Sequence, residues 1–199
     1  MEAERKKYKV AIIGIGPVGM ILAVKLQEAG CEVALCEVNE GKATKIRNDG
    51  LILENVIKAN ASFSKVYHTI PELKEFGPDY IFFSLKSNHT AHAVKQAECL
   101  ITDKLTVISA QNGIDVEQLL VAGFGENRTL RLVINFAGNT ISPNCTKVTF
   151  FTAPNYIASI NDALTDKAKE LALLLTSVNL ETKAIDSFEL TKRAWEKQF

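Results

Sequence analysis

The beginning of the chain alternates short apolar runs with a helical pattern. Lys9–Ile13 is a continuous apolar run rich in β-branched residues and followed by a glycine, which predicts a buried strand. Val18–Ala29 continues with the apolar spacing of a helix and a stop at Gly30, and Glu32–Glu37 predicts a second strand. Strand, glycine-rich turn, helix and strand within about 30 residues make a βαβ unit, and such a unit builds a parallel sheet.

The same alternation continues along the chain and predicts a doubly wound α/β fold with a mostly parallel sheet. Weaker patterns predict a helix at 42–47, strands at 50–54 and 63–67, and one or two helical turns at 71–76. Stronger patterns predict strands at 79–85, 105–108 and 129–136, and helices at 88–100, 114–121 and 163–178. Ser87 or Asn88 is expected to cap the helix at 88–100.

The last part of the chain departs from this alternation. Lys147–Thr152 and Asn155–Ile160 predict two strands joined at Ala153-Pro154, which we expect to form a hairpin appended to the parallel sheet. Glu181–Ile185 predicts a final strand, and Ser187 is expected to cap a closing helix.

The closing helix has no stop signal. Its apolar positions continue to the last residue, with no glycine or asparagine after them: Phe188, Leu190, Ala194, Trp195 and Phe199. We therefore expect residues 1–186 to form one α/β domain and residues 187–199 to be the truncated start of a helical one. An apolar helix face without its partner favours association, so some self-association is expected.

Charge and composition exclude several classes of function. The 199 residues carry 23 Lys and Arg against 23 Asp and Glu, whereas a nucleic-acid binder needs an excess of positive charge. The charged N-terminus and the glycines that interrupt the next apolar run fit neither a signal peptide nor a membrane span. Four cysteines without a C-x-x-C spacing are typical of reduced thiols. We therefore expect a cytoplasmic protein that binds neither nucleic acid nor membranes.

A glycine-rich turn joins the first strand to the first helix. Its G-x-G-x-x-G sequence is Gly14, Ile15, Gly16, Pro17, Val18 and Gly19, and Glu37 ends the next strand. The first glycine permits a tight turn, the second lets the backbone approach a pyrophosphate, and the third lets helix and strand pack closely. Residues 1–186 are therefore expected to be a dinucleotide-binding, Rossmann-type domain. A tight turn without a ligand is the alternative.

Glu37 bears on which dinucleotide binds. A carboxylate at this position can accept hydrogen bonds from both hydroxyls of the adenosine ribose in NAD. In NADP the 2′-oxygen carries a phosphate, and two negative charges would meet at short range. The residues themselves therefore favour NAD(H), although Lys42, Lys45 and Arg47 follow closely and can neutralise a phosphate.

Two polar residues follow two further predicted strands. Lys86 comes just after the strand at 79–85, and Asn112 stands in a Gln-Asn-Gly turn after the strand at 105–108. Ligands of open parallel sheets bind at the carboxyl ends of the strands, where both residues are expected. Each also has a plainer interpretation, a surface lysine and ordinary turn chemistry. His89 and His92 have a spacing that metal sites use, but no third ligand is evident and no metal is expected.

At this point the chain resembles a known family, the ketopantoate reductases or 2-dehydropantoate 2-reductases. The resemblance covers nearly the whole chain but only the N-terminal two-thirds of a typical family member. Its motifs are Ala11–Gly19, Ile46–Leu51, Ser84-Leu85-Lys86, Ala110–Gly113 and Trp195-Glu196-Lys197. Many dehydrogenases share the glycine motif, whereas the later motifs in this order are much more specific.

The resemblance implies reduction of a 2-oxo acid, ketopantoate, with NADPH on the pathway to pantothenate and coenzyme A. Carried over, Lys197 is the general acid that protonates the ketone oxygen. Asn112 positions the nicotinamide end and the substrate, and Lys86 contacts cofactor or substrate. The 199 residues alone are expected to have little reductase activity, because family members continue into a helical domain that supplies further substrate ligands.

One departure from the family concerns the cofactor. Family members often carry an arginine after the second strand that pairs with the 2′-phosphate of NADPH, and here the stretch is Glu37-Val38-Asn39. NADP(H) is therefore the family default, and NAD(H) is what this sequence favours. Two alternatives to ketopantoate reduction remain: another keto- or hydroxy-acid dehydrogenase of similar layout, and a non-catalytic module that senses nicotinamide nucleotides.

Overall fold

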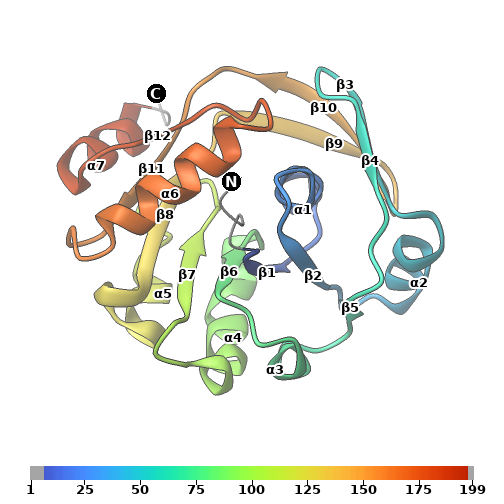
Figure 1. Ribbon diagram of the computed structural model, residues 1–199, viewed down its shortest axis with the longest axis horizontal. Helices are drawn as coiled ribbons and strands as arrows, with labels where there is room; N and C mark the ends of the chain where they lie inside the picture. Colours follow the sequence, from blue (N-terminus) through green and yellow to red (C-terminus); the bar gives the residue numbers. More distant parts are fainter. Residues whose placement is uncertain (1–6, 197–199) are drawn as a thin grey trace, which may run out of the picture.

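The computed structural model describes residues 7–196, which contain an eight-stranded sheet with the order β12-β11-β8-β7-β6-β1-β2-β5 (Figure 1). Its strands are β1 (Lys9–Ile13), β2 (Glu32–Cys36), β5 (Val66–Tyr67), β6 (Tyr80–Phe83), β7 (Thr106–Ser109), β8 (Thr129–Val133), β11 (Asn155–Ser159) and β12 (Thr182–Ala184). Every neighbouring pair is parallel except β11 and β8. The run from β5 to β8 has the strand order of a doubly wound dinucleotide-binding sheet. The predicted α/β fold with a mostly parallel sheet is confirmed.

A second sheet of four strands covers the first helix. Its order is β4-β3-β10-β9, formed by β3 (Leu51–Asn55), β4 (Ala59–Ala61), β9 (Phe136–Ser142) and β10 (Cys145–Phe151). Helix α1 (Pro17–Glu28) contacts strands of both sheets and lies between them in Figure 1. Gly19–Leu26 is buried without interruption. Because both sheets cover α1, apolar residues occur on every side of this helix and not on a single face.

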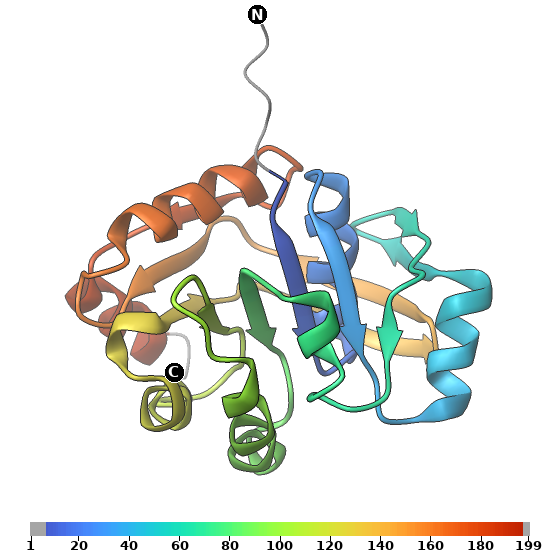
Figure 2. The same ribbon diagram turned by 60° about the horizontal axis from the view of Figure 1, so that its bottom comes forward.

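The remaining helices lie around the central sheet. Figures 1 and 2 show α3 (Leu73–Phe76), α4 (Ser87–Ala97) and α5 (Gln118–Phe124) on the side opposite α1 and α6 (Thr165–Thr176). Helix α2 (Glu40–Asp49) follows β2, and 3-10 turns occupy Glu98–Leu100 and Glu126–Arg128. The two faces of the sheet carry separate apolar cores. Successive residues of a central strand therefore point into different cores. Because both faces are covered, apolar residues are needed at consecutive positions of the strand.

The predicted hairpin at the end of the chain is wrong. Strand β10 pairs with β9 and β3 in the second sheet, whereas β11 pairs with β8 and β12 in the central sheet. The burial patterns explain the separation, because β10 alternates with one face exposed and β11 is almost entirely buried. The Asn155 side chain holds β11 in place, accepting from the Asn135 amide (2.8 Å) and donating to the Glu181 carbonyl (3.2 Å).

Other boundaries also differ from the sequence-based expectations. The predicted strand at 129–136 ends at Val133, and its last residue begins β9 in the other sheet. The predicted strand at 63–67 is reduced to β5. Helix α5 begins at Gln118 instead of residue 114, because Asp115 has the left-handed φ of 56°, through which a helix cannot continue.

The expected side-chain caps of two helices are wrong. Helix α4 begins at Ser87, with Lys86 at the cap position and no side-chain hydrogen bond to the helix end. The closing helix α7 (Ser187–Glu196) is capped by Asp186, whose carboxylate accepts from the Glu189 amide at 2.7 Å. The predicted Gly30 stop of α1 is confirmed, since this glycine follows the helix with φ of 92°.

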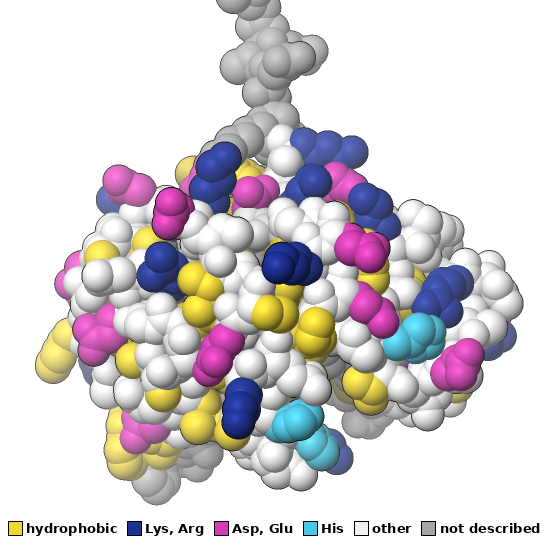
Figure 3. Space-filling view, turned by 90° about the horizontal axis from the view of Figure 1, so that it is seen from below, with side chains coloured by type: hydrophobic (Ala, Val, Ile, Leu, Met, Phe, Trp, Pro, Cys, Tyr) yellow, Lys and Arg dark blue, Asp and Glu magenta, His cyan; other side chains and the backbone are white. Residues whose placement is uncertain are grey.

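Charges of both signs are scattered over the face that carries α3, α4 and α5, as Figure 3 shows. Among residues 7–196, no helix is long and apolar enough to cross a membrane.

Candidate active site

A cavity of about 920 Å³ opens where the order of the central sheet reverses, between β1 and β6. Its lining comes from the glycine turn after β1, the end of β2, the segment after β6 and the turn after β7. These are carboxyl ends of parallel strands, where doubly wound folds bind their ligands. The volume lies in the upper part of the range for pockets that enclose small molecules.

The absence of a side chain has a different structural consequence at each of the three glycines of the turn. Gly14 has φ of 92°, and a Cβ atom there would lie 2.7 Å from the Leu85 side chain. A Cβ atom on Gly19 would lie 2.1 Å from the Gly14 carbonyl oxygen and 2.8 Å from Ser84 Oγ, which itself donates to that carbonyl at 2.7 Å. Gly16 has no atom within 4 Å of its Cβ position. The first and third glycines close the turn, and the second leaves open space on its cavity side.

The start of α1 suits an anion. Pro17 occupies the first turn, where its missing N–H removes nothing from the helix, and no side chain caps this end. The N–H groups of Val18 and Gly19 have no acceptor within the helix and lie at its positive end. Val18 directly precedes the long buried part of α1 and Gly19 begins it, so the packing of the helix fixes these donors in place. The residues present therefore fit the pyrophosphate of a dinucleotide.

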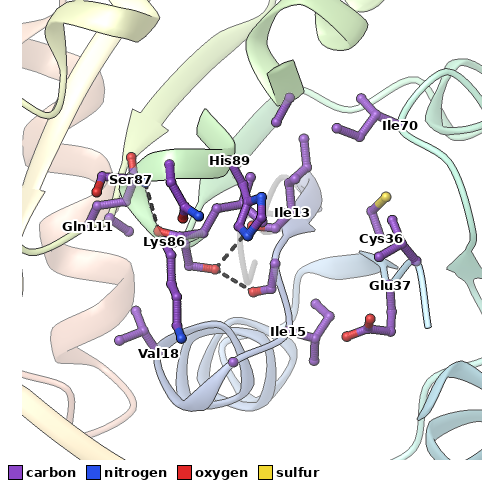
Figure 4. A pocket seen from close by; sticks show the side chains of 18 of the residues that line it. Ile13, Ile15, Val18, Cys36, Glu37, Ile70, Lys86, Ser87, His89 and Gln111 are labelled. Carbon is purple, nitrogen blue, oxygen red and sulfur yellow. Dashed lines mark hydrogen bonds between the residues drawn. The ribbon is translucent and has the colours of Figure 1, made fainter. Parts of the chain in front are cut away.

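Glu37 lies at the other end of the cavity from Lys86, as Figure 4 shows. Its carboxylate accepts from the Asn39 amide at 3.0 Å and forms an ion pair with Lys42 Nζ at 2.9 Å. Lys42 also donates to the carbonyl oxygen of Ile15 in the glycine turn. The acidic residue expected near a ribose is therefore present, and it is already paired with a cation that lines the same cavity.

The other two basic residues named with Lys42 do not line the cavity. Lys45 pairs with Asp49 on the same helix, and Arg47 donates to the Val66 carbonyl and contacts His68. Of the three basic residues Lys42, Lys45 and Arg47, Lys42 is therefore the one that lies beside Glu37.

Lys86 and Asn112 line the same cavity, as their positions after two neighbouring strands predict. Figure 4 shows Lys86 extended toward Val18 at the start of α1. Gln111, which sequence reasoning did not single out, donates to the Leu85 carbonyl at 2.7 Å and to Thr90 Oγ1 at 2.6 Å. One buried amide thus joins the turn of Asn112 to the segment of Lys86. Its signal in the sequence was its place in the Gln-Asn-Gly turn.

The lining also includes one cysteine and two histidines. Burial raises the pKa of the Cys36 thiol to about 12, so a neutral thiol lies beside Glu37. His89 and His92 also line the cavity. Within residues 7–196 no three histidine, cysteine or acidic side chains gather as a metal site would require.

Lys197, the predicted general acid, lies outside the described residues.

Comparison with known proteins agrees with this architecture. The family model described as Ketopantoate reductase PanE/ApbA matches residues 10–161. A 2-dehydropantoate 2-reductase of Aquifex aeolicus (strain VF5) is 26% identical over 176 residues, which are 88% of this chain and 54% of the relative.

Solved structures show the same fold. The 2-dehydropantoate 2-reductase of Methylococcus capsulatus matches with a TM-score of 0.83 and 17% identity, over 95% of this chain and 60% of that one. D-mandelate dehydrogenase with NADH and anilino(oxo)acetate matches with a TM-score of 0.77 and 22% identity, over 89% of this chain and 56% of that one. The chain thus spans little more than half the length of these relatives. Because the family model matches most of its residues, the chain belongs to the ketopantoate reductase family of oxidoreductases.

Proposed function

We propose that the protein reduces a small 2-oxo acid with a nicotinamide dinucleotide, and that ketopantoate is the leading substrate. One observation carries the proposal: a single cavity joins the glycine turn and Glu37 to Lys86 and Asn112. The first pair suits the phosphates and adenosine ribose of a dinucleotide. The second pair places a cation and an amide on the other side, where a negatively charged 2-oxo acid would be held.

Each residue then has a distinct chemical task. When bound, the dinucleotide supplies the hydride for the carbonyl carbon. Lys86 attracts an anion by its charge, and Asn112 offers one donor and one acceptor group at a fixed place. Lys197 is proposed, from the family resemblance alone, to give its proton to the carbonyl oxygen as negative charge develops there. Reduction of the ketone to the alcohol is complete once carbon has gained the hydride and oxygen the proton.

Substrate assays of the complete protein test this function. NADH and NADPH consumption would be measured with ketopantoate and with other small 2-oxo acids, and ketopantoate is expected to give the highest kcat/KM. The match to D-mandelate dehydrogenase supports a second candidate, a dehydrogenase for another 2-oxo acid, and a different best substrate would favour it. Cofactor binding without turnover of any 2-oxo acid would instead favour the nucleotide-sensing module.

We also propose that α7 belongs to a second, helical domain beginning near Ser187. The helix packs on the central sheet through Leu190 and Ala194, whereas Phe188 is 81% exposed and Trp195 is 48% exposed. These exposed apolar side chains also support the expected self-association of the 199-residue chain.

NADH is expected to bind more tightly than NADPH, by about tenfold or more, a difference of about 1.4 kcal/mol. A 2′-phosphate about 4 Å from the Glu37 carboxylate would cost on the order of 4 kcal/mol at an effective dielectric constant near 20, and Lys42 offsets part of this cost. Replacing Glu37 by alanine removes the ion-pair partner of Lys42, and Val38→Arg adds a second cation at an exposed position. The Glu37→Ala/Val38→Arg variant should therefore prefer NADPH, measured by fluorescence titration of both cofactors.

Lys45→Ala is the matched control for this preference. It removes a nearby lysine that pairs with Asp49 and does not line the cavity, so the ratio of the two affinities should not change. Tighter binding of NADPH by the unmodified protein would contradict the prediction and would assign Lys42 to the phosphate.

A further inference from the structure

A buried ion pair lies behind the turn that carries Asn112. Arg131 is the middle residue of β8, and it stands level with Ser109, the last residue of β7, in the sheet register. Its Nη1 donates to the carboxylate of Glu117, and its Nη2 donates to the carbonyl oxygen of Gly113. Arg131 is only 4% exposed and Glu117 only 8%. A charged pair this deep stabilises a fold weakly, because removing both charges from water offsets their attraction.

The contact with Gly113 is what distinguishes this pair. Gly113 follows Asn112 and has φ of 128°, a conformation that side chains rarely adopt. A glycine adopts this conformation without strain but also many others, so contacts with its surroundings are needed to hold one shape of the turn. On one side Gln111 is bonded to Leu85 and Thr90, and on the other side Arg131 holds the Gly113 carbonyl. The turn that carries Asn112 is therefore held by an anchor on each side of that residue.

Arg131 does not itself face the large cavity. Among the described residues, Asn112 belongs to the lining of that cavity, whereas Arg131 borders a separate space of about 10 Å³ behind the turn, which Asn112 and Gly113 also border. A ligand in the large cavity thus meets Asn112 and not the guanidinium. Any effect of Arg131 on the ligand must pass through the turn.

We propose that Arg131 is a positioning residue: together with Glu117 it sets where Asn112 meets the nicotinamide end of the cofactor. The inference rests on the proposed function, because it needs a nicotinamide dinucleotide in the large cavity. Glu37, where the adenosine end is proposed to bind, lies on the far side of the cavity from Gln111 of the turn (Figure 4). Loss of the anchor should therefore weaken recognition of one half of the ligand and leave the other half unaffected.

Comparison of NADH with ADP-ribose tests this asymmetry, because ADP-ribose lacks the nicotinamide. The variant is Arg131→Met/Glu117→Gln, which removes both charges together, so that neither is left buried alone. Wild-type protein is expected to bind NADH more tightly than ADP-ribose. In the variant the affinity for NADH should fall about tenfold, and that for ADP-ribose should change less than about twofold, since the adenosine half is bound elsewhere.

Two further variants separate positioning from stability. Tyr80→Phe removes a partly buried hydrogen bond to Glu170 (3.2 Å) at the amino end of β6, away from the cavity, so it should lower stability and leave both affinities unchanged. Arg131→Lys keeps the charge beside Glu117 but lacks the fork that reaches two acceptors at once, so NADH affinity should still fall.

Each remaining outcome overturns the inference. If both ligands weaken equally in the double variant, Arg131 has only a structural role. If neither weakens, or if wild-type protein binds both equally, the turn contributes nothing to recognition. If wild-type protein binds neither ligand, the proposed function fails as well, which separates that failure from the other three.

Discussion

Lys197→Ala in the complete protein is expected to lower kcat by about 10²–10⁴-fold, the typical loss when a positioned general acid is removed. That range corresponds to about 3–5 kcal/mol of transition-state stabilisation. Cofactor affinity should change little, because the alanine removes a proton donor and no part of the glycine turn. The kcat for ketopantoate and the dissociation constant of NADH would be measured on the same preparation.

The described part of α7 lies close to the turn of Asn112. Ala194, which comes three positions before Lys197 in the sequence, borders the same small space as Asn112. Lys192→Ala is the matched control, since Lys192 is a lysine of α7 with its side chain 57% exposed and 4.0 Å from Glu196. Near-normal turnover by Lys197→Ala would remove the residue from the catalytic role.

Gly19→Ala is expected to destabilise the fold by about 3 kcal/mol, the upper part of the usual range for overpacking. The new methyl group would meet the Gly14 carbonyl at 2.1 Å, and α1 cannot retreat because strands of both sheets enclose it. In a chain of this length the melting temperature should fall on the order of 10 °C. Thermal unfolding followed by circular dichroism measures the shift.

Gly16→Ala is the matched contrast, because it adds the same methyl group three residues earlier in the motif, into open space. Its backbone angles, φ −76° and ψ −173°, suit any residue, so stability should stay within about 0.5 kcal/mol. NADH affinity should nevertheless fall about tenfold or more, since the methyl group occupies the approach of the pyrophosphate. Unchanged stability in Gly19→Ala, or unchanged affinity in Gly16→Ala, would contradict this account of the turn.

Local patterns in the sequence were sufficient for the parallel strands from β1 to β8 of the central sheet and for half of the candidate site. The strand before Gly14, the helix after it and the strand that ends at Glu37 follow one another within about 30 residues. Their sequence alone predicts the glycine turn, a dinucleotide as its ligand and the position of Glu37. Lys86 and Asn112 followed from a general rule about the ends of parallel strands, and the structure places both on one cavity.

Long-range pairing could not be predicted in the same way. Strand β3 pairs in parallel with β10, and Ile52 opposes Cys145 across a large separation in sequence. No local pattern predicts that pairing. The sequence instead predicts a hairpin of β10 with β11, the next strand along the chain. Arg131 did leave a signal, a charged residue between Leu130 and Leu132 in a buried strand, but its partners Glu117 and Gly113 became evident only in the structure.

The enclosure of α1 between two sheets has a consequence for how binding entropy is distributed. Gly19–Leu26 is buried, so the donors at the start of α1 are held rigid before any ligand arrives, and little conformational freedom remains there to be lost. Helix α4, across the cavity, buries only Thr90, Ala93, Val94 and Ala97 and faces water on its other side. We therefore expect adjustment to ligands of different shape to occur in α4 and the segment before it. Substitutions that stiffen this region should raise affinity more than substitutions in α1.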